Sequence, residues 1–177
     1  MARNVEVKIK VDDLEGLRSR ALALGAMDHG VLHQVDTYFA TPPALGARLK
    51  LREHTGGRSE LIAYRRPDTP GFRTSDFHLV PVEAPESLRE ALRHALGVVH
   101  QVVKTRQLLL LGRTRIHLDR VEGLGDFLEL EVVLADGDDV TGGEQEAEGL
   151  LAQLGVSGRP RIAGSYADRA AGAVRGD

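Results

Sequence analysis

The feature that most constrains the fold is a strict alternation of ionic and apolar residues between positions 103 and 134. Successive side chains of a β-strand point to opposite faces, so a period of two separates two surfaces. The ionic residues at odd positions are Arg113, Arg115, His117, Asp119, Glu129 and Glu131, and the apolar residues at even positions are Ile116, Leu118, Leu128, Leu130, Val132 and Leu134. Glycines at 112 and 123 mark two reversals, which predicts a meander of three antiparallel strands.

The same alternation occurs in two earlier segments of the chain. Residues 4–11 place Asn4, Glu6, Lys8 and Lys10 on one face, and residues 47–53 do the same with Arg48, Lys50 and Arg52. For one strand alone, a solvated face is the ordinary explanation of such a pattern. Its recurrence with the signs segregated favours a shared ionic surface. In the returning strand at 60–66, the pattern leaves open whether Arg65 or Arg66 shares that surface.

Helical stripes separate these strand segments. Asp12 is the expected N-cap of a first helix, with Glu15 as its capping-box partner, and Gly25 ends that helix. Apolar residues at helical spacing predict two more helices, over residues 86–96 and 144–154.

Further strands are predicted at 33–39 and 75–82, with a polar loop over 68–73. Pro81 lacks a backbone donor, which predicts that the strand containing it lies at a sheet edge. A short helix and a frayed end are expected after residue 161, with fraying from about residue 170. About eight strands and three or four helices indicate the α+β class, with a large antiparallel sheet.

Composition narrows the functional classes. The 177 residues suit a single domain over 1–177, and a formal net charge of -3 offers no overall field for DNA. There is no cysteine, and no run of apolar residues reaches the length of a membrane span. We therefore expect a soluble, cytoplasmic protein with neither DNA nor a membrane as partner, and the sequence leaves a homodimer open.

The distribution of charge signs points to a ligand. Carboxylates lie on the first strand and the last, whereas lysines and arginines populate the strands between them. Closing the sheet would bring its first and last strands together and gather the glutamates against one wall. Hard divalent ions take carboxylate oxygens, and phosphate chains bind to several lysines and arginines. A lining of both kinds suits a polyphosphate bound together with a metal ion.

Several of these segments resemble the motifs of a known family. Asn4-x-Glu6-x-Lys8 resembles the Glu-x-Glu-x-Lys signature of the CYTH superfamily, the triphosphate tunnel metalloenzymes. That superfamily includes class IV adenylyl cyclases, thiamine triphosphatases and inorganic triphosphatases. The resemblance continues in order through residues 36–39, Arg48-x-Lys50-x-Arg52, Lys104-x-Arg106 and residues 121–131. Within the last segment, the run Glu-Gly-Leu-Gly-Asp-Phe most resembles class IV cyclases.

The resemblance implies a closed antiparallel β-barrel of about eight strands, a triphosphate tunnel, with helices packed outside. It implies that Glu6, Glu129 and Glu131 bind Mg²⁺ or Mn²⁺, with Asp119 as a further acidic residue near the metal. The implied triphosphate-binding residues are Lys8, Arg52, Lys104 and Arg106, together with Arg65 or, as the alternative, Arg66. Arg48, Lys50 and Arg115 join them because the alternation gives them the same face.

Lys8, Lys104 and Asp119 are the expected catalytic residues, with Lys8 orienting or deprotonating the nucleophile and Lys104 clamping the phosphates with Arg106. The chain departs from the signature at Asn4, which lacks the charge of the expected glutamate. His117 shares the parity of Asp119, and we interpret it as a polar wall residue. Three functions stay open: a class IV adenylyl cyclase, a triphosphatase, and a non-catalytic module that binds polyphosphates or RNA ends.

Overall fold

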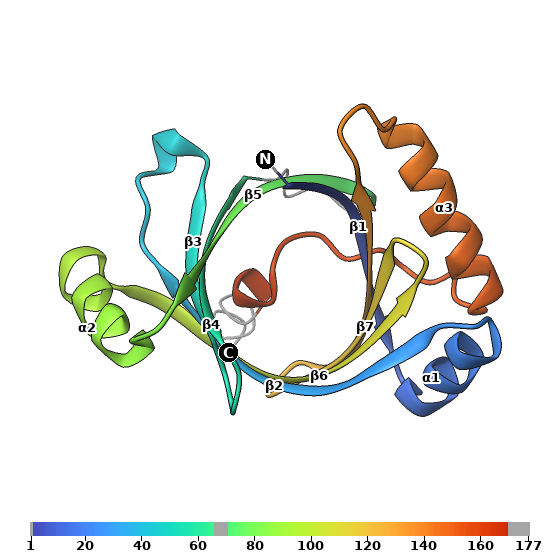
Figure 1. The fold of residues 1–177 in the computed structure, drawn as a ribbon, viewed down its shortest axis with the longest axis horizontal. Helices are drawn as coiled ribbons and strands as arrows, with labels where there is room; N and C mark the ends of the chain where they lie inside the picture. The colour runs from blue at the N-terminus through green and yellow to red at the C-terminus, as the bar shows by residue number, and fades with distance from the viewer. Residues whose placement is uncertain (1, 66–70, 170–177) are drawn as a thin grey trace.

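The strands close into a barrel (Figure 1). A computed structural model describes residues 2–65 and 71–169, and within these ranges eight strands form one closed sheet. The strands are β1 Ala2–Val11, β2 Met27–Phe39, β3 Arg48–His54, β4 Ser59–Arg65, β5 Arg73–Val82, β6 Val98–Leu111, β7 Thr114–Val121 and β8 Gly125–Leu134. Their order around the barrel is β1-β5-β4-β3-β2-β6-β7-β8, and every neighbouring pair is antiparallel.

The predicted α+β class and the closed barrel are confirmed, and so is the central meander of β6, β7 and β8. Gly112 and Gly123 both have positive φ, which explains why glycine stands at these two reversals. The barrel closes because β1 pairs with β8 along one side and with β5 along the other.

The prediction of an edge strand over 75–82 was wrong in two respects. β5 begins at Arg73, inside the segment predicted to be a loop, and it is a barrel strand flanked by β1 and β4. Its pairing with β1 ends at Phe77, whereas its pairing with β4 continues to Val82. Pro81 therefore lies in the part of β5 that has one strand neighbour, β4, which agrees with the preference of proline for positions at a sheet edge.

The helices are α1 Leu14–Ala23, α2 Pro85–Leu96 and α3 Val140–Gln153. Asp13, rather than the predicted Asp12, caps α1, since its Oδ1 accepts a hydrogen bond of 2.8 Å from the Gly16 N–H. Asp139 caps α3, which begins four residues before the predicted start. Within the described residues, no helix combines the length and the apolar character that a bilayer crossing requires.

A first apolar core lies between the barrel wall and two helices. Figure 1 shows α1 and α3 together on one side of the barrel, with α2 on the opposite side. The outward-facing side chains of β1 and β8, such as Val7 and Leu130, are buried there against Leu17 of α1 and Leu151 of α3. Alternation therefore separates this outer core from the ionic inner face of the same strands.

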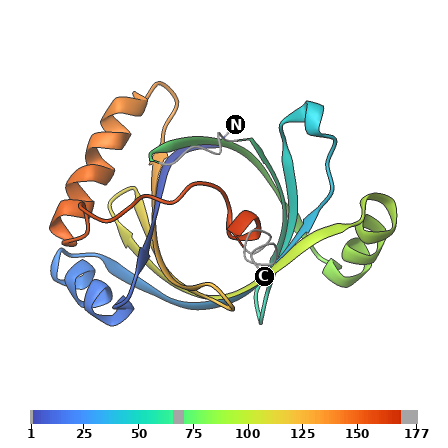
Figure 2. The same cartoon turned by 180° about the vertical axis from the view of Figure 1, so that it is seen from behind.

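A second apolar cluster lies at one end of the barrel. After α3 the chain returns to the barrel, where Ile162 N–H donates to the Lys8 carbonyl at 2.8 Å, and a helical turn at 166–169 enters the ring of strands (Figures 1 and 2). Tyr166 and Ala167 pack there with Phe127 and Val121. The predicted short C-terminal helix thus forms part of the interior, while the predicted frayed end from residue 170 lies outside the described residues.

We predict that two glycines of α3 respond oppositely to alanine. Gly149 is exposed and has open space at its Cβ position, so Gly149→Ala is expected to raise the free energy of unfolding by about 0.5–1 kcal/mol. Gly143 is buried, and an added Cβ would lie 3.0 Å from methyl groups of Leu134 and Val5. Gly143→Ala is therefore expected to lower the free energy of unfolding by about 1 kcal/mol. Urea unfolding of both variants measures the difference, and an equal gain in both would contradict this packing of α3.

Candidate functional site

The inner face of the barrel encloses a cavity of about 460 Å³. Its walls come from alternate residues of all eight strands, with Ser165 and Tyr166 of the C-terminal turn. The charged and histidine side chains that line it are Glu6, Lys8, Lys50, Arg52, His54, Glu60, Lys104, Arg106, Arg115, His117, Glu129 and Glu131. The prediction that the ionic sides of separate strands form one lining is confirmed.

Asp36 of β2 holds three cations together. Its carboxylate accepts two hydrogen bonds of 2.7 Å from the Arg52 guanidinium and one of 3.0 Å from Lys50 Nζ, and Lys104 Nζ lies at 3.4 Å. Burial acts to raise the pKa of Asp36, but Arg52, Lys104 and Lys50 outweigh it and hold that pKa well below its usual range. Asp36 does not line the cavity, so it holds these cations from behind.

Asp119 of β7 is likewise the buried counter-ion of Arg106. The Arg106 guanidinium donates two hydrogen bonds of 2.6 Å to Asp119 and a third, of 3.0 Å, to Glu129 Oε2. The Tyr166 hydroxyl also donates to Asp119, at 2.7 Å. Despite complete burial, Arg106 and Lys104 keep the pKa of Asp119 below its usual range. Asp119 was predicted to lie near the metal, and it shares the Arg106 guanidinium with the predicted ligand Glu129.

Lys8 lies deep in the cavity beside the C-terminal turn. Its Nζ is 3.1 Å from Glu129 Oε1 and 3.8 Å from the ring centroid of Tyr166, and Lys104 Nζ is 5.3 Å from the same centroid. Burial and the neighbouring carboxylate of Asp119 raise the pKa of the Tyr166 hydroxyl well above its usual value, so it stays protonated as a donor. A tyrosine from the end of the chain therefore supports two lysines of the barrel wall.

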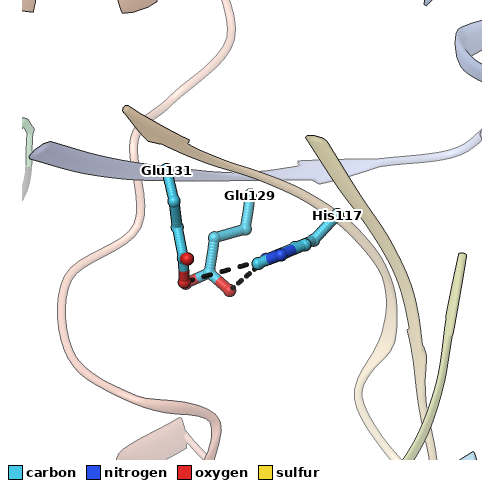
Figure 3. A group of neighbouring side chains, drawn as sticks. All are labelled: His117, Glu129 and Glu131. Carbon is cyan, nitrogen blue, oxygen red and sulfur yellow. Dashed lines mark ion pairs between the residues drawn. The ribbon is translucent and has the colours of Figure 1, made fainter. Parts of the chain in front are cut away.

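Glu129 and Glu131 converge with His117, as Figure 3 shows. His117 is the direct cross-strand neighbour of Glu129, and one potential ligand atom from each of the three residues lies within 4.8 Å of the others. Burial, followed by the Arg106 charge, lowers the pKa of His117, so its imidazole is neutral at neutral pH. A neutral imidazole and two carboxylates together provide ligand atoms that can bind a divalent cation.

Glu6 stands slightly apart from that group. Its Cα pairs with that of Glu131 across β1 and β8, so the sheet does bring the first and last strands together as predicted. The Glu6 carboxylate, however, lies 3.2 Å from Arg73 Nη2, a buried guanidinium that also donates to the Gly164 carbonyl at 3.1 Å. Among the described residues, the group with metal-ligand spacing contains His117 in place of the predicted Glu6.

Most of the cations predicted to face the cavity do so, with two exceptions. Arg65 is exposed and has the parity of the outer face of β4, because Ile62 and Tyr64 face inward. Its predicted place in the site was wrong, and the alternative, Arg66, lies outside the described residues. Arg48 does not line the cavity, since its Nη1 binds Asp168 at 2.6 Å and Ser165 at 3.1 Å. It therefore ties the C-terminal turn to β3.

Four contributors were not among the predicted site residues, and one of them, His117, was interpreted only as a polar wall residue. Arg73 and Tyr166 were missed because each follows an irregular segment, where strand parity gives no signal. Asp36 belongs to the motif at 36–39, but an isolated aspartate in an otherwise neutral strand does not reveal three cationic partners from two neighbouring strands. The signal for Asp36 is the segregation of signs itself, since three buried cations require a counter-charge.

The comparisons with known proteins agree with this geometry. The sequence model of the CYTH domain family matches residues 2–166. The chain belongs to the CYTH family. Adenylate cyclase CyaB of Aeromonas hydrophila is 25% identical over 170 residues, which cover 92% of this chain and 85% of that protein.

Solved structures share the CYTH barrel. The PH1012 protein of Pyrococcus horikoshii OT3 has a TM-score of 0.82 and 25% identity, over 93% of this chain and 98% of that one. HpAC1 of Hippeastrum, described as having a dominant triphosphatase activity, has a TM-score of 0.66 and 14% identity, over 97% and 96% of the two chains. At that identity the likeness to HpAC1 shows the fold alone.

We predict that Asp36→Asn destabilises this CYTH barrel strongly. The change leaves Lys50, Arg52 and Lys104 buried without their shared counter-charge, which is expected to cost about 3–5 kcal/mol in the free energy of unfolding. Inorganic tripolyphosphate should restore more stability to the variant than to the parent, since the added anion replaces the lost carboxylate.

Thermal and urea unfolding, each with and without tripolyphosphate, measure both effects. Asp126→Asn is the matched control, because Asp126 pairs with an exposed arginine, Arg120, and such surface pairs contribute about 1 kcal/mol or less. Similar losses in the two variants would show that Asp36 is not the shared counter-ion.

Proposed function

We propose that this protein is a metal-dependent enzyme acting on a triphosphate bound in the barrel, and specifically an adenylyl cyclase that converts ATP to cyclic AMP and pyrophosphate. The observation that carries the proposal is that cations line the cavity while their buried counter-ions do not. Lys50, Arg52, Lys104 and Arg106 line the cavity, whereas Asp36 and Asp119 hold them from behind. Donors fixed in this way are set to bind phosphate oxygens without rearrangement.

The cluster of Glu129, Glu131 and His117 fits a divalent ion such as Mg²⁺ or Mn²⁺. Glu129 and Glu131 are buried or nearly so, and their oxygens converge with a nitrogen of His117. Glu6 stays a predicted ligand, which would have to exchange its contact with Arg73 for the ion. When bound, such an ion would neutralise charge on the phosphate oxygens and favour displacement at phosphorus.

The residues of the chain then divide the work of binding. The edge of the Arg52 guanidinium that faces away from Asp36 can bind two phosphate oxygens, whereas Arg106 already donates from Nε and twice from Nη2 and offers its Nη1. Lys50 and Lys104 add amino groups beside them, and burial together with Arg106 lowers the pKa of Lys104 well below its usual value. Lys8 is held between Glu129 and the ring of Tyr166, where its ammonium can donate a hydrogen bond to a phosphate oxygen. Arg115, at the exposed end of the same face, would bind a more distant phosphate.

The cyclase reading rests on the resemblance of residues 122–127 to class IV cyclases and on the match to CyaB along most of both chains. Hydrolysis of a terminal phosphate is the second candidate. The C-terminal turn packs at one end of the barrel, with Tyr166 beside Lys8 and Lys104. A terminal phosphate that reached these lysines would lie beside that turn, where the attacking group could be water.

The deciding experiment follows all products of one reaction. Purified protein is incubated with ATP and Mg²⁺ or Mn²⁺, and cyclic AMP, pyrophosphate and orthophosphate are quantified together. Equal amounts of cyclic AMP and pyrophosphate support the cyclase, whereas orthophosphate without cyclic AMP overturns it in favour of hydrolysis. Tripolyphosphate and thiamine triphosphate are tested in parallel, and binding without turnover of any of them would leave a non-catalytic module.

We predict that Glu129→Gln and Glu131→Gln each reduce metal-dependent turnover by about 100-fold or more, because the ion supplies several kcal/mol of transition-state stabilisation. Both variants should remain folded, with the lower melting temperature in Glu129→Gln because it removes buried ion pairs with Lys8 and Arg106, as circular dichroism and thermal unfolding will report. Glu83→Gln, at an exposed position between β5 and α2, is the control and should retain full activity. Unchanged turnover in either cavity variant would remove that residue from the ligand set.

We also predict that phosphate binding depends on the charge of Lys50. Burial, together with Arg52, lowers the pKa of Lys50 to about 8, so this lysine loses its charge as the pH rises from 7 to 9. In Lys50→Arg the charge persists across that range. The ratio of the variant's affinity for tripolyphosphate to the parent's affinity should therefore be about 3-fold to 10-fold larger at pH 9 than at pH 7.

Isothermal titration of both proteins at each pH gives this ratio, in which the ionisation of tripolyphosphate itself cancels. Lys10→Arg, at an exposed position outside the cavity, is the control. A ratio that does not change with pH would show that Lys50 is not the group that titrates.

A further inference from the structure

One buried atom in the cluster of His117, Glu129 and Glu131 has no hydrogen-bond partner among the described residues. His117 Nδ1 is enclosed by protein, and no donor or acceptor among the described residues lies within hydrogen-bond distance. Glu129 Oε2 and Glu131 Oε1 are the nearby ionic groups, at 3.6 Å and 3.8 Å. Buried polar atoms are nearly always satisfied, so an orphaned nitrogen that points at two carboxylates calls for a further partner.

The spacing of these atoms matches the coordination sphere of a small ion. With bond lengths of about 2.1 Å, two adjacent ligands of an octahedral ion lie about 3 Å apart and two opposite ligands about 4.2 Å apart. The two separations from His117 Nδ1 fall between these limits. An ion placed among the three residues would satisfy the nitrogen and both carboxylates at once.

The barrel fixes this geometry through two neighbouring strands. His117 and Glu129 are paired directly across β7 and β8, and Glu131 lies two residues further along the same face of β8. The site is therefore built on paired strands rather than on a loop, which holds ligand positions more rigidly.

The first strand, β1, departs from the family signature at one position near these three residues. Asn4 stands where the family signature has a glutamate, and its buried Oδ1 also lacks a hydrogen-bond partner among the described residues. Asn4 pairs with Val133, which places it diagonally from Glu131. Relative to an all-carboxylate site, this chain has lost one negative oxygen ligand on β1 and offers a neutral nitrogen on β7.

We propose that His117, Glu129 and Glu131 form a three-ligand centre that selects a first-row transition ion such as Mn²⁺ or Co²⁺ over Mg²⁺. Mg²⁺ prefers oxygen ligands and water, whereas imidazole nitrogen suits the transition ions. The inference deepens the proposed function by naming the ion and the residue that selects it. Metal binding can be measured without any substrate, so the two proposals can fail separately.

The test measures metal binding by the whole chain after removal of metal with a chelator. Mn²⁺ is titrated by the loss of its free electron paramagnetic resonance signal, and Mg²⁺ by its competition with Mn²⁺. The parent protein should bind Mn²⁺ at least about 10-fold more tightly than Mg²⁺. His117→Gln should weaken Mn²⁺ binding about 10-fold or more and change Mg²⁺ binding less than about 3-fold.

Pulsed electron paramagnetic resonance of the Mn²⁺-loaded protein gives a readout independent of activity. Coupling to a ¹⁴N nucleus is expected in the parent and in the control His33→Gln, whose histidine is exposed on β2, and it should vanish in His117→Gln. His117→Asn serves as a second variant if the first has a lowered melting temperature.

Nitrogen coupling that persists in a folded His117 variant, or equal losses of Mn²⁺ and Mg²⁺ affinity, would overturn the proposal. Mn²⁺ binding and Mn²⁺-dependent turnover that are indifferent to His117 would do the same and would leave the proposed enzyme intact. Absence of turnover alongside His117-dependent Mn²⁺ binding would remove the proposed function and keep this metal centre.

Discussion

The structure depends on the neutralisation of charges that a closed barrel takes out of water. Removing an ion from water costs several kcal/mol even after the protein relaxes, so an unpaired lysine or arginine could not be held inside. Asp36 meets this requirement for Lys50, Arg52 and Lys104, and Asp119 meets it for Arg106. The two aspartates therefore allow the cationic lining to exist at all.

Their position behind the cations has a functional consequence. A counter-ion placed inside the cavity would compete with a phosphate chain, whereas one placed in the wall fixes each cation and leaves its other donors available. Glu129 differs in this respect, because it lines the cavity and contacts both Lys8 and Arg106.

The C-terminal turn packs into one end of the barrel. Tyr166 donates to Asp119, and Asp168 binds Arg48, while Ile162 and Ala167 join the apolar cluster on that side. Packed side chains and a few directed hydrogen bonds thus hold the turn at that end of the barrel. The CYTH barrel itself does not decide the chemistry, since one fold can host different reactions. The residues of the site must decide it, and in this chain Asn4 and His117 are the two that depart from an all-glutamate arrangement.

Much of this could be predicted from the sequence, because alternation is a local property. The inner and outer faces of β1, β3, β7 and β8 follow directly from a period of two, and so does the cationic character of the lining. The resemblance along the chain supplied the closure of the barrel. Parity failed for Arg65, where two adjacent arginines made the register ambiguous, and at Arg73, where the strand began earlier than its pattern suggested.

The sequence by itself determined which side chains face inward on each regular strand, since that choice depends on neighbours two residues apart. Only the tertiary structure decided which of those side chains meet. Asp36 finds cations from β3 and β6, Glu6 lies against Arg73, and Tyr166 arrives from the far end of the chain to meet Asp119. Such pairings depend on the order and register of strands around the barrel, and the free energy that fixes them comes from packing and charge neutralisation across segments remote in sequence.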